Sequence, residues 1–419
     1  MNISSHKIKG YTIILIPAKG GMTLVQSHIH TGFIHEDKKT LGISHLMEHI
    51  MADSWKKCKG PCPQYWNKKG TSSNAFTSNT FVGYWILGLK EWNREMAEYV
   101  IAASSCDFIK KTILSDEKNA VKEELLREMN KPTWKMANTL YQEYFDNFGV
   151  KNNNNLPLQI KNLKHFKSAD IEKICKKIYI PSNIMFTVVG NFKKKNVLET
   201  FRKKLKTGPQ NKLQPILPNV QTKQSVIHIL RKNAKKTDIT ISFYSTFFPW
   251  DEDTYYFNLI ETILSRGLES ILMDHLRTKL NLIYSVGMDI MVDNMGTITT
   301  VNMSTQDKNI KDVVEHTIGK IRQFTVGDYH SDFLTGAKNK QLVEAETTCK
   351  NVEFLSEFYG EQYSSQILRK KKKIISHEKL VSKIKKVTKK DIVKISNKLF
   401  DFKTMKVIYM GKTKSHTTI

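Results

Sequence analysis

The chain contains two stretches with the same pattern, and this internal repeat is the feature that most restricts its fold. SADIEKICKKIYIPSNIMFTVVGN begins at Ser168 and KKDIVKISNKLFDFKTMKVIYMGK begins at Lys389, so they align without a gap at an offset of 221 residues. Asp170 matches Asp391 near the start of each stretch. Each stretch predicts a helix with an acidic first turn, followed by an apolar strand that ends at glycine. A match over the whole unit at one offset indicates a duplicated domain.

The beginnings of the two halves also share a pattern. Residues 11–16 and 22–34 predict a β-hairpin, and residues 225–230 and 238–248 predict a second one. A helical segment follows each pair. We therefore expect an α+β fold of two similar domains, each an antiparallel sheet with helices on one face.

The segment between the halves is predicted to be a linker. Residues 205–224 contain three prolines and show little periodicity. The expected boundaries are therefore 1–204 for the first domain, 205–224 for the linker and 225–419 for the second domain.

The sequence HLMEH places three chemically active side chains within five positions. On a helix that opens near residues 42–44, His45, Glu48 and His49 share one face because they stand at i, i+3 and i+4. Two imidazoles one turn apart can both reach a tetrahedral zinc ion, and the carboxylate beside them can take a proton from a water molecule. H-x-x-E-H is the inverzincin pattern, the reverse of H-E-x-x-H. A histidine-rich amphipathic helix without a metal is the alternative.

A third ligand is expected from the acidic helix predicted over residues 115–132. This segment begins with Ser-Asp-Glu and ends at a proline, which are start and stop signals of a helix. Glu117 and Glu124 lie seven residues apart and share a face of that helix. Glu123 and Glu128 are competing acids, and a solvated acidic face would explain all of them without a metal.

The net charge of +26 raises the possibility of a nucleic-acid partner or an acidic surface. Lysines are spread along the whole chain and no nucleic-acid-binding motif accompanies them, so we interpret them as solvated faces and do not expect nucleic acid as a partner. A basic nucleic-acid-binding protein remains an alternative, and steep salt-dependent retention of DNA would support it.

The cysteines and apolar segments bear on the compartment. Five cysteines are scattered along the chain, and Cys58 and Cys62 stand at C-x3-C rather than the C-x2-C of common zinc knuckles. We interpret them as ordinary thiols, which favours a reducing compartment. No apolar run is long enough to span a membrane, and the N-terminus has neither signal-peptide nor transit-peptide features. We expect a cytoplasmic protein without a membrane partner, or a virion protein if the chain is viral.

Together these motifs resemble the pitrilysin/insulysin family of zinc metallopeptidases, in the short two-domain form of the mitochondrial processing peptidase subunits. After HLMEH, 74 residues separate the motif from Glu124. GTSSNAFTSNTFVGYW, from Gly70, is similar to a strand motif of that family. HLRTKLNLIYSV, from His275, is similar to its arginine–tyrosine pair.

The resemblance implies a role for each matching residue. His45, His49 and Glu124 would hold one Zn²⁺ per chain, and Glu48 would be the general base that activates the attacking water. Glu117 would orient a histidine ligand.

The resemblance also assigns the substrate contacts. Asn74 and Ala75 would bind the substrate backbone on a strand that accepts the peptide as an added strand. Arg277 and Tyr284 would grip the substrate from the second half and help to stabilise the oxyanion.

These expectations describe a zinc-dependent endopeptidase that acts on unfolded peptides or precursor proteins, with the metal site in domain 1–204. An idle processing or core-type subunit that serves assembly is the alternative from another class. Because idle relatives usually lose part of the site, the complete set of His45, Glu48, His49 and Glu124 favours the enzyme.

The resemblance predicts a dimer. The family builds a closed chamber from four such domains, and this chain has two, so it needs a second copy of itself or a related chain. We expect a homodimer, with twice the 48.4 kDa of one chain by light scattering at micromolar concentration. The mass of a single chain would contradict this prediction.

Overall fold

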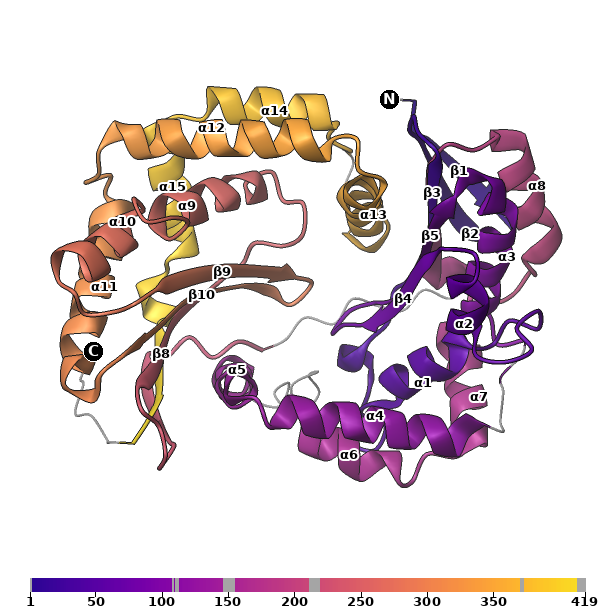
Figure 1. Cartoon of the computed structure of the whole chain (residues 1–419), viewed down its shortest axis with the longest axis horizontal. Coiled ribbons are helices and arrows are strands. Elements are labelled where there is room, and N and C mark those ends of the chain that lie inside the picture. The colour runs from indigo at the N-terminus through magenta and orange to yellow at the C-terminus, as the bar shows by residue number, and fades with distance from the viewer. Residues whose placement is uncertain are drawn as a thin grey trace. The chain divides into compact units, whose positions relative to one another are not determined.

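The computed structural model describes residues 2–107, 109, 113–145, 155–210, 219–369 and 373–412. These residues form two compact units. Figure 1 shows their helices and strands, coloured by residue number. Unit 1 comprises Met1–Lys131, Val150–Ile216 and Thr348–Ile374. Unit 2 comprises Pro132–Gly149, Leu217–Thr347 and Ile375–Ile419.

Unit 1 contains a six-stranded sheet and the helices around it. Its strands are β1 (Ser4–Ile8), β2 (Tyr11–Pro17), β3 (Met22–Ile29), β4 (Ser72–Thr77), β5 (Val82–Leu89) and β6 (Ile184–Gly190). Its helices are α1 (Ile43–Ala52), α2 (Cys62–Asn67), α3 (Asn93–Ala103), α4 (Leu114–Met129), α6 (Leu156–Leu163), α7 (Ser168–Ile178), α8 (Lys194–Lys204) and α13 (Val352–Arg369). Its short helical turns are η1 (Phe33–His35), η2 (Lys90–Trp92) and η5 (Pro181–Asn183).

Unit 2 contains a five-stranded sheet and its helices. Its strands are β7 (Ser225–Leu230), β8 (Thr237–Ser245), β9 (Val286–Asp293), β10 (Gly296–Thr305) and β11 (Lys406–Gly411). Its helices are α5 (Pro132–Tyr144), α9 (Phe257–Leu264), α10 (Ile271–Met273), α11 (Ile310–Thr325), α12 (Ser331–Thr348), α14 (His377–Lys386) and α15 (Lys389–Leu399). Its short turns are η6 (Thr254–Tyr256), η7 (Asp274–Lys279), η8 (Asp307–Asn309) and η9 (Phe402–Thr404).

The two sheets have the same topology apart from one strand. The order is β1-β2-β6-β3-β5-β4 in unit 1 and β7-β11-β8-β10-β9 in unit 2, so β1 is an addition within the described residues. In each sheet one pair is parallel, β2 with β6 and β7 with β11, and every other pair is antiparallel. The predicted α+β class with two similar, largely antiparallel sheets is confirmed.

The helices of the repeat begin at the predicted offset. α7 begins at residue 168 and α15 at residue 389, which preserves the offset of 221. The Asp170 carboxylate accepts a hydrogen bond from the Lys167 backbone N–H at 2.9 Å, and Asp391 accepts the same bond from Thr388 at 2.8 Å. Both aspartates therefore cap the first turn of their helix.

Both predicted hairpins are wrong, and in the same way. β6 lies between β2 and β3, and β11 lies between β7 and β8, so the strands that follow each other in the sequence do not pair. The inserted strand returns to the sheet after a long crossover and is buried along its whole length in both units. Pairing with such a distant strand is not encoded in the local pattern of the first two strands.

One helix crosses between the halves in each direction. α13 comes from the second half of the chain and belongs to unit 1, whereas α5 comes from the first half and belongs to unit 2. The compact units therefore differ from the expected contiguous domains 1–204 and 225–419. Residues 211–218 of the expected linker lie outside the described residues.

α13 fits the sheet of unit 1 through a stripe of small residues. Ser356 bonds to Gln26 at 2.9 Å and Ser364 bonds to His30 at 2.8 Å. Between them, a Cβ on Gly360 would lie 3.0 Å from the His28 ring. Four residues of helix rise about 6 Å and two residues of strand about 6.6 Å, so the helix and the strand stay in step. Figure 1 shows α13 on one side of this sheet and α3 and α8 on the other.

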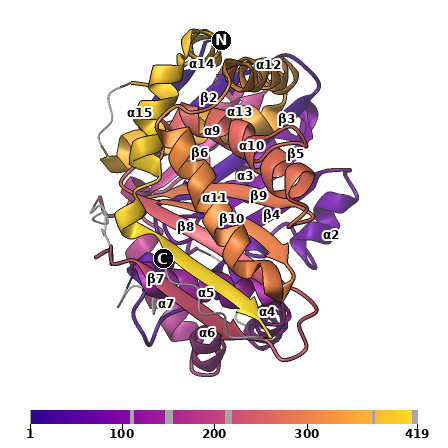
Figure 2. The same cartoon turned by 90° about the vertical axis from the view of Figure 1, so that its left-hand side faces the viewer.

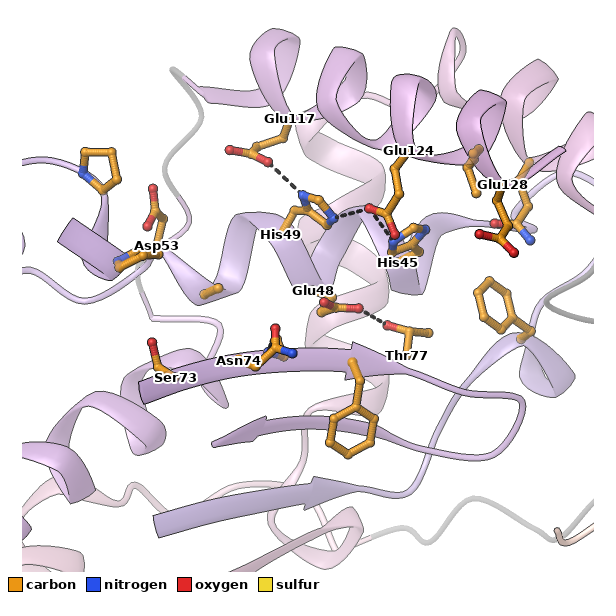
Figure 3. A pocket seen from close by; sticks show the side chains of 18 of the residues that line it. His45, Glu48, His49, Asp53, Ser73, Asn74, Thr77, Glu117, Glu124 and Glu128 are labelled. Carbon is orange, nitrogen blue, oxygen red and sulfur yellow. Dashed lines mark hydrogen bonds and ion pairs between the residues drawn. The ribbon is translucent and has the colours of Figure 1, made fainter. Parts of the chain in front are cut away.

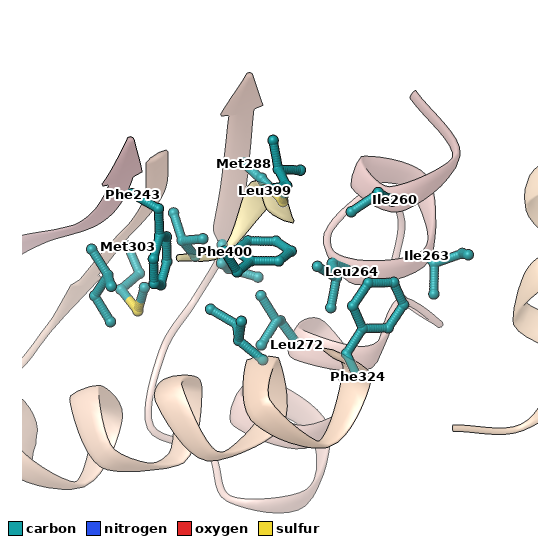
Figure 4. Packing of buried hydrophobic residues seen from close by; sticks show 14 of the residues in the cluster. Phe243, Ile260, Ile263, Leu264, Leu272, Met288, Met303, Phe324, Leu399 and Phe400 are labelled. Carbon is teal, nitrogen blue, oxygen red and sulfur yellow. The ribbon is translucent and has the colours of Figure 1, made fainter. Parts of the chain in front are cut away.

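α5 covers the corresponding face of the sheet of unit 2. The Tyr144 hydroxyl donates to Ser242 Oγ at 3.1 Å, and the Ser225 hydroxyl donates to Glu143 at 3.0 Å. Because side chains alternate along a strand, Ile241 and Phe243 point to the opposite face. There they join a buried apolar cluster with α9, α11 and α15 (Figure 4). Figure 2 shows these three helices on the near side of the sheet. Helices thus pack on both faces of each sheet, one face more than we expected.

The structure contradicts the interpretation of the cysteines as ordinary thiols. Cys58 pairs with Cys62 and Cys106 with Cys175 in disulfides, with Cα–Cα distances of 5.2 and 5.9 Å. The second pair is 69 residues apart in the sequence, with Cys106 just after α3 and Cys175 on α7, so no local pattern reports it. The cysteines therefore no longer support a reducing compartment.

Over the described ranges, no helix combines the length and the apolar character needed to cross a bilayer.

The α13 interface makes a prediction about acid stability. His28 is 3% exposed, and burial lowers its pKa to about 4 from an ordinary value of 6.5. The unfolded chain therefore binds a proton below about pH 6.5 that the folded chain does not bind until about pH 4. As the pH falls through this window, we expect a loss of unfolding free energy on the order of 3 kcal/mol from this group.

Chemical denaturation of the wild type and of His28→Leu at several pH values tests this. The unfolding free energy of the wild type should fall relative to that of His28→Leu as the pH falls from 6.5 to 4. A difference that is independent of pH would contradict the prediction.

Candidate metal centre

The helix that carries the HLMEH motif is positioned by a buried carboxylate. Glu36 is 6% exposed, and its two oxygens accept hydrogen bonds from the backbone N–H groups of Gly42 at 2.7 Å and Ser44 at 2.8 Å. These donors stand at the start of α1, where a helix leaves N–H groups without partners. Burial raises the pKa of Glu36 to about 7, against the effect of these hydrogen bonds. Glu36 therefore acts as a remote cap that fixes where α1 begins.

α1 and α4 bring three ligand-type side chains together. Glu124 Oε2 lies 3.7 Å from His45 Nε2 and 3.5 Å from His49 Nε2 (Figure 3). One ligand atom from each of the three residues lies within 4.8 Å of the others. The hydrogen bonds of His45 and His49 to Glu124 hold the pKa of Glu124 well below its usual range.

This arrangement fits a zinc ion. Bonds of about 2.0–2.1 Å at tetrahedral angles separate two ligand atoms by roughly 3.4 Å, close to the two distances from Glu124. Two imidazole nitrogens and one carboxylate form the donor set of a catalytic zinc site, in which the fourth position stays open. Within the described part of the chain, no other group of three or more such residues converges in this way.

Glu117 contacts His49 on the side of the ring away from Glu124. Its Oε2 is 3.0 Å from His49 Nδ1, which leaves the other ring nitrogen of His49 to face Glu124. Burial acts to lower the pKa of His49, but the hydrogen bonds to Glu117 and Glu124 outweigh it and raise the pKa to about 9. A carboxylate on the outer nitrogen fixes the orientation of the ring and makes it a better ligand.

The competing acids of α4 take other positions. Glu123 is exposed and does not line the cavity. Glu128 lines the cavity but pairs with Lys131 on the neighbouring turn. Glu124 is therefore the acid of this helix that faces both histidines.

Glu48 lies beside the three ligand-type residues and is bonded to the sheet. It is 9% exposed, and the Thr77 hydroxyl donates to its Oε2 at 2.7 Å (Figure 3). Burial raises the pKa of Glu48, while His45 and the Thr77 hydroxyl oppose that shift. A carboxylate with a raised pKa suits a general base, because it can hold a proton at a pH nearer neutrality.

These residues share one cavity of about 760 Å³ with strand β4. The cavity is lined by His45, Glu48, His49, Glu117 and Glu124, together with residues 73–77 of β4 and Asp53, Glu128 and several apolar side chains. Among the described residues that line it, none is lysine or arginine, in a chain with 66 of them. The cavity is therefore an acidic region of a basic chain.

β4 is one of the two edge strands of its sheet, within the described residues. It pairs with β5 and, among the described strands, with no other. Asn74 and Ala75 lie in the middle of it and line the cavity, and Asn74 Oδ1 accepts from the Ala75 backbone N–H at 2.9 Å. An exposed edge of this kind can accept another strand.

Arg277 and Tyr284 lie in unit 2 and contact each other. The Arg277 guanidinium sits 4.8 Å from the centre of the Tyr284 ring. Tyr284 is 71% exposed, and both residues line a cavity of about 600 Å³ within that unit. The structure thus brings this pair together in unit 2 and the metal-type residues together in unit 1.

Family models match both halves of the chain. The model described as "Insulinase (Peptidase family M16)" matches residues 22–155, and the model described as "Peptidase M16 inactive domain" matches residues 165–340. The chain belongs to peptidase family M16. This confirms the resemblance to the pitrilysin/insulysin family that its motifs suggested.

Relatives of this M16 chain are similar over nearly its full length. A protein of Rickettsia felis named an uncharacterized zinc protease is 21% identical over 381 residues, which cover 90% of this chain and 89% of that protein. A protease from Helicobacter pylori has the same fold, with a TM-score of 0.83, 16% identity and coverage of 98% and 99%. A chain of Complex III2 from Candida albicans also has this fold, with a TM-score of 0.80, 14% identity and coverage of 98% and 96%.

Sequence analysis of this M16 chain missed two residues of the centre. Glu36 stands nine positions before His45, and no local pattern marks it as a cap for a helix that starts seven residues later. Thr77 belongs to the strand motif from Gly70, but the motif alone does not show that its hydroxyl reaches Glu48.

The Glu36 cap makes a prediction about α1. In Glu36→Ala the buried N–H groups of Gly42 and Ser44 lose their acceptor, which should lower the unfolding free energy by about 1–3 kcal/mol. Hydrogen exchange of these two amides should become faster than in the wild type.

Asp37→Ala is the matched control, because the Asp37 carboxylate bonds to Lys39 and Thr40 outside α1. Its exchange at residues 42 and 44 should resemble that of the wild type. Equal exchange in all three proteins would show that Glu36 does not fix the start of α1.

Proposed function

We propose that this M16 chain is a zinc-dependent endopeptidase that hydrolyses peptide bonds in unfolded peptides or precursor proteins. The observation that carries the proposal is the convergence of His45, His49 and Glu124 beside a buried Glu48. The zinc-protease name of the Rickettsia felis relative points in the same direction.

The residues of the centre divide the chemistry between them. His45, His49 and Glu124 would hold zinc, which when bound supplies a Lewis acid that polarises a carbonyl and lowers the pKa of water. Glu48 takes a proton from the attacking water as the water oxygen bonds to the carbonyl carbon. It then gives the proton to the amine nitrogen as the carbon–nitrogen bond breaks.

Strand β4 supports an extended substrate. We propose that the peptide pairs with the open edge of β4 at Asn74 and Ala75 and lies along the cavity that Glu48 lines. Recognition through the backbone would favour unfolded chains, because a folded protein already uses its backbone groups. The acidic lining makes a basic polypeptide the first substrate to try.

We also propose a substrate-binding role for Arg277 and Tyr284. The stacked guanidinium and the exposed phenol offer hydrogen-bond donors suited to a peptide carbonyl or a developing oxyanion. Arg277→Ala should then raise KM or lower kcat without changing zinc affinity. Unchanged kinetics would remove the pair from the proposal.

The second candidate is an idle subunit that serves assembly. The observation that favours it is the shared fold of a chain in Complex III2 from Candida albicans. Because the fold is common to both candidates, only the chemistry of the centre separates them. An assembly role does not need the complete set of ligands and base, so their presence favours the peptidase.

Cleavage of a basic, unfolded polypeptide by the wild type and by Glu48→Gln tests the proposal. Both proteins are loaded with zinc, and bound zinc is measured in each. We expect the wild type to cleave and Glu48→Gln to lose activity by about 100-fold or more while it retains zinc, since the base is removed and the ligands are kept.

The contrary results are equally informative. Glu48→Gln that cleaves as fast as the wild type would contradict the role of the base. Two inert proteins with zinc bound would favour the assembly subunit instead.

A further inference from the structure

The hydrogen bond between Thr77 and Glu48 joins strand β4, which has an open edge, to helix α1, which carries the HLMEH motif. Thr77 is the last residue of β4, the strand with the open edge, and Glu48 is in the middle of α1. The Thr77 hydroxyl donates to Glu48 Oε2 at 2.7 Å. This contact binds one carboxylate oxygen, so that Oε1 is the oxygen left for a water molecule.

The contact is built into the fold through one short segment. The backbone N–H of Phe33 donates to Ser78 at 3.3 Å, and that of Ile34 donates to Asn79 at 3.0 Å. A Cβ on Gly32 would lie 2.3 Å from the Ser78 carbonyl oxygen, so the segment lies against the end of β4. Residues 32–34 therefore fix the chain immediately after Thr77.

The same segment fixes the partner of Thr77. It continues into Glu36, whose carboxylate caps the start of α1 at Gly42 and Ser44. Residues 32–36 thus determine the position of the strand that carries Thr77 and of the helix that carries Glu48. The same short segment therefore positions both partners of the hydrogen bond between Thr77 and Glu48.

The residues that face the metal position are held by other contacts. Glu124 faces His45 and His49, and Glu117 contacts His49. These contacts join α1 to α4 and do not involve β4. The hydroxyl of Thr77 therefore acts on the base and not on the ligands.

We propose that Thr77 is a positioning residue that sets the Glu48 carboxylate relative to strand β4. A peptide paired with β4 then meets the base at a fixed distance and orientation, because the strand that holds the peptide also holds the base. This inference rests on the proposed function, and it adds a residue and a coupling that the function alone does not require.

The test compares Thr77→Val, which removes the hydroxyl and keeps the shape, with Thr77→Ser, which keeps the hydroxyl. Thr139→Val is the matched control, because the Thr139 hydroxyl donates to the Lys135 carbonyl within α5 and does not line this cavity. Each protein is assayed on a fluorescence-quenched peptide rich in lysine and arginine. Zinc affinity is measured by competition with a chromophoric chelator.

We expect Thr77→Val to lower kcat about tenfold or more, with KM and zinc affinity near those of the wild type. Thr77→Ser should restore kcat, and Thr139→Val should leave it unchanged. Wild-type kcat in Thr77→Val would overturn the inference. Equal losses in the valine and serine variants, with weakened zinc binding, would overturn it too, because they indicate a structural role.

A crystal structure of Thr77→Val gives a second measurement that does not depend on activity. The Glu48 carboxylate should move while His45, His49 and Glu124 keep their positions. An unmoved Glu48 would overturn the inference. A wild type that binds zinc and cleaves nothing would instead contradict the proposed function, and the position of Glu48 would still decide the role of Thr77.

Discussion

The pairing of the Glu36 carboxylate with two backbone N–H groups is the interaction on which the centre depends. It determines the residue at which α1 begins. Because each residue of a helix turns the chain by about 100°, the starting residue also determines which face presents His45, Glu48 and His49. Burial of a carboxylate is unfavourable unless its oxygens are bonded, so the capping contacts both require Glu36 and hold it in place. The orientation of His45, Glu48 and His49 therefore follows from this one contact.

Local patterns predicted the elements well and their partners poorly. The offset of 221 between the repeats appears again in α7 and α15, because capping aspartates and apolar periodicity are local properties. The repeat predicted β6 and β11 as strands, but it did not predict their insertion between the two strands expected to pair, since no pattern in neighbouring strands reports a distant third strand. The destination of α13 was not predicted either. Its small residues Ser356, Gly360 and Ser364 are meaningful only beside the strand that they match.

The centre divides in the same way. The spacing of His45, Glu48 and His49 is enough to place them on one helical face, and the resemblance to the family selected Glu124 where periodicity left Glu123 and Glu128 open. Glu36 and Thr77 act through contacts between elements, which spacing does not report. Net charge gave no guide to the centre, because the excess of lysine is spread over the chain while the cavity is acidic.

The exchange of α5 and α13 has a consequence for how the chain is made. The last strand of the first sheet ends at residue 190, but the helix that covers one of its faces begins only at residue 352. During synthesis that face, with His28 on it, must wait for the ribosome to complete most of the second half. Cutting the chain between the halves would leave each fragment with a helix that belongs to the other. Each fragment would lack the helix that covers one face of its sheet until the two associated, so the duplicated halves fold as one unit.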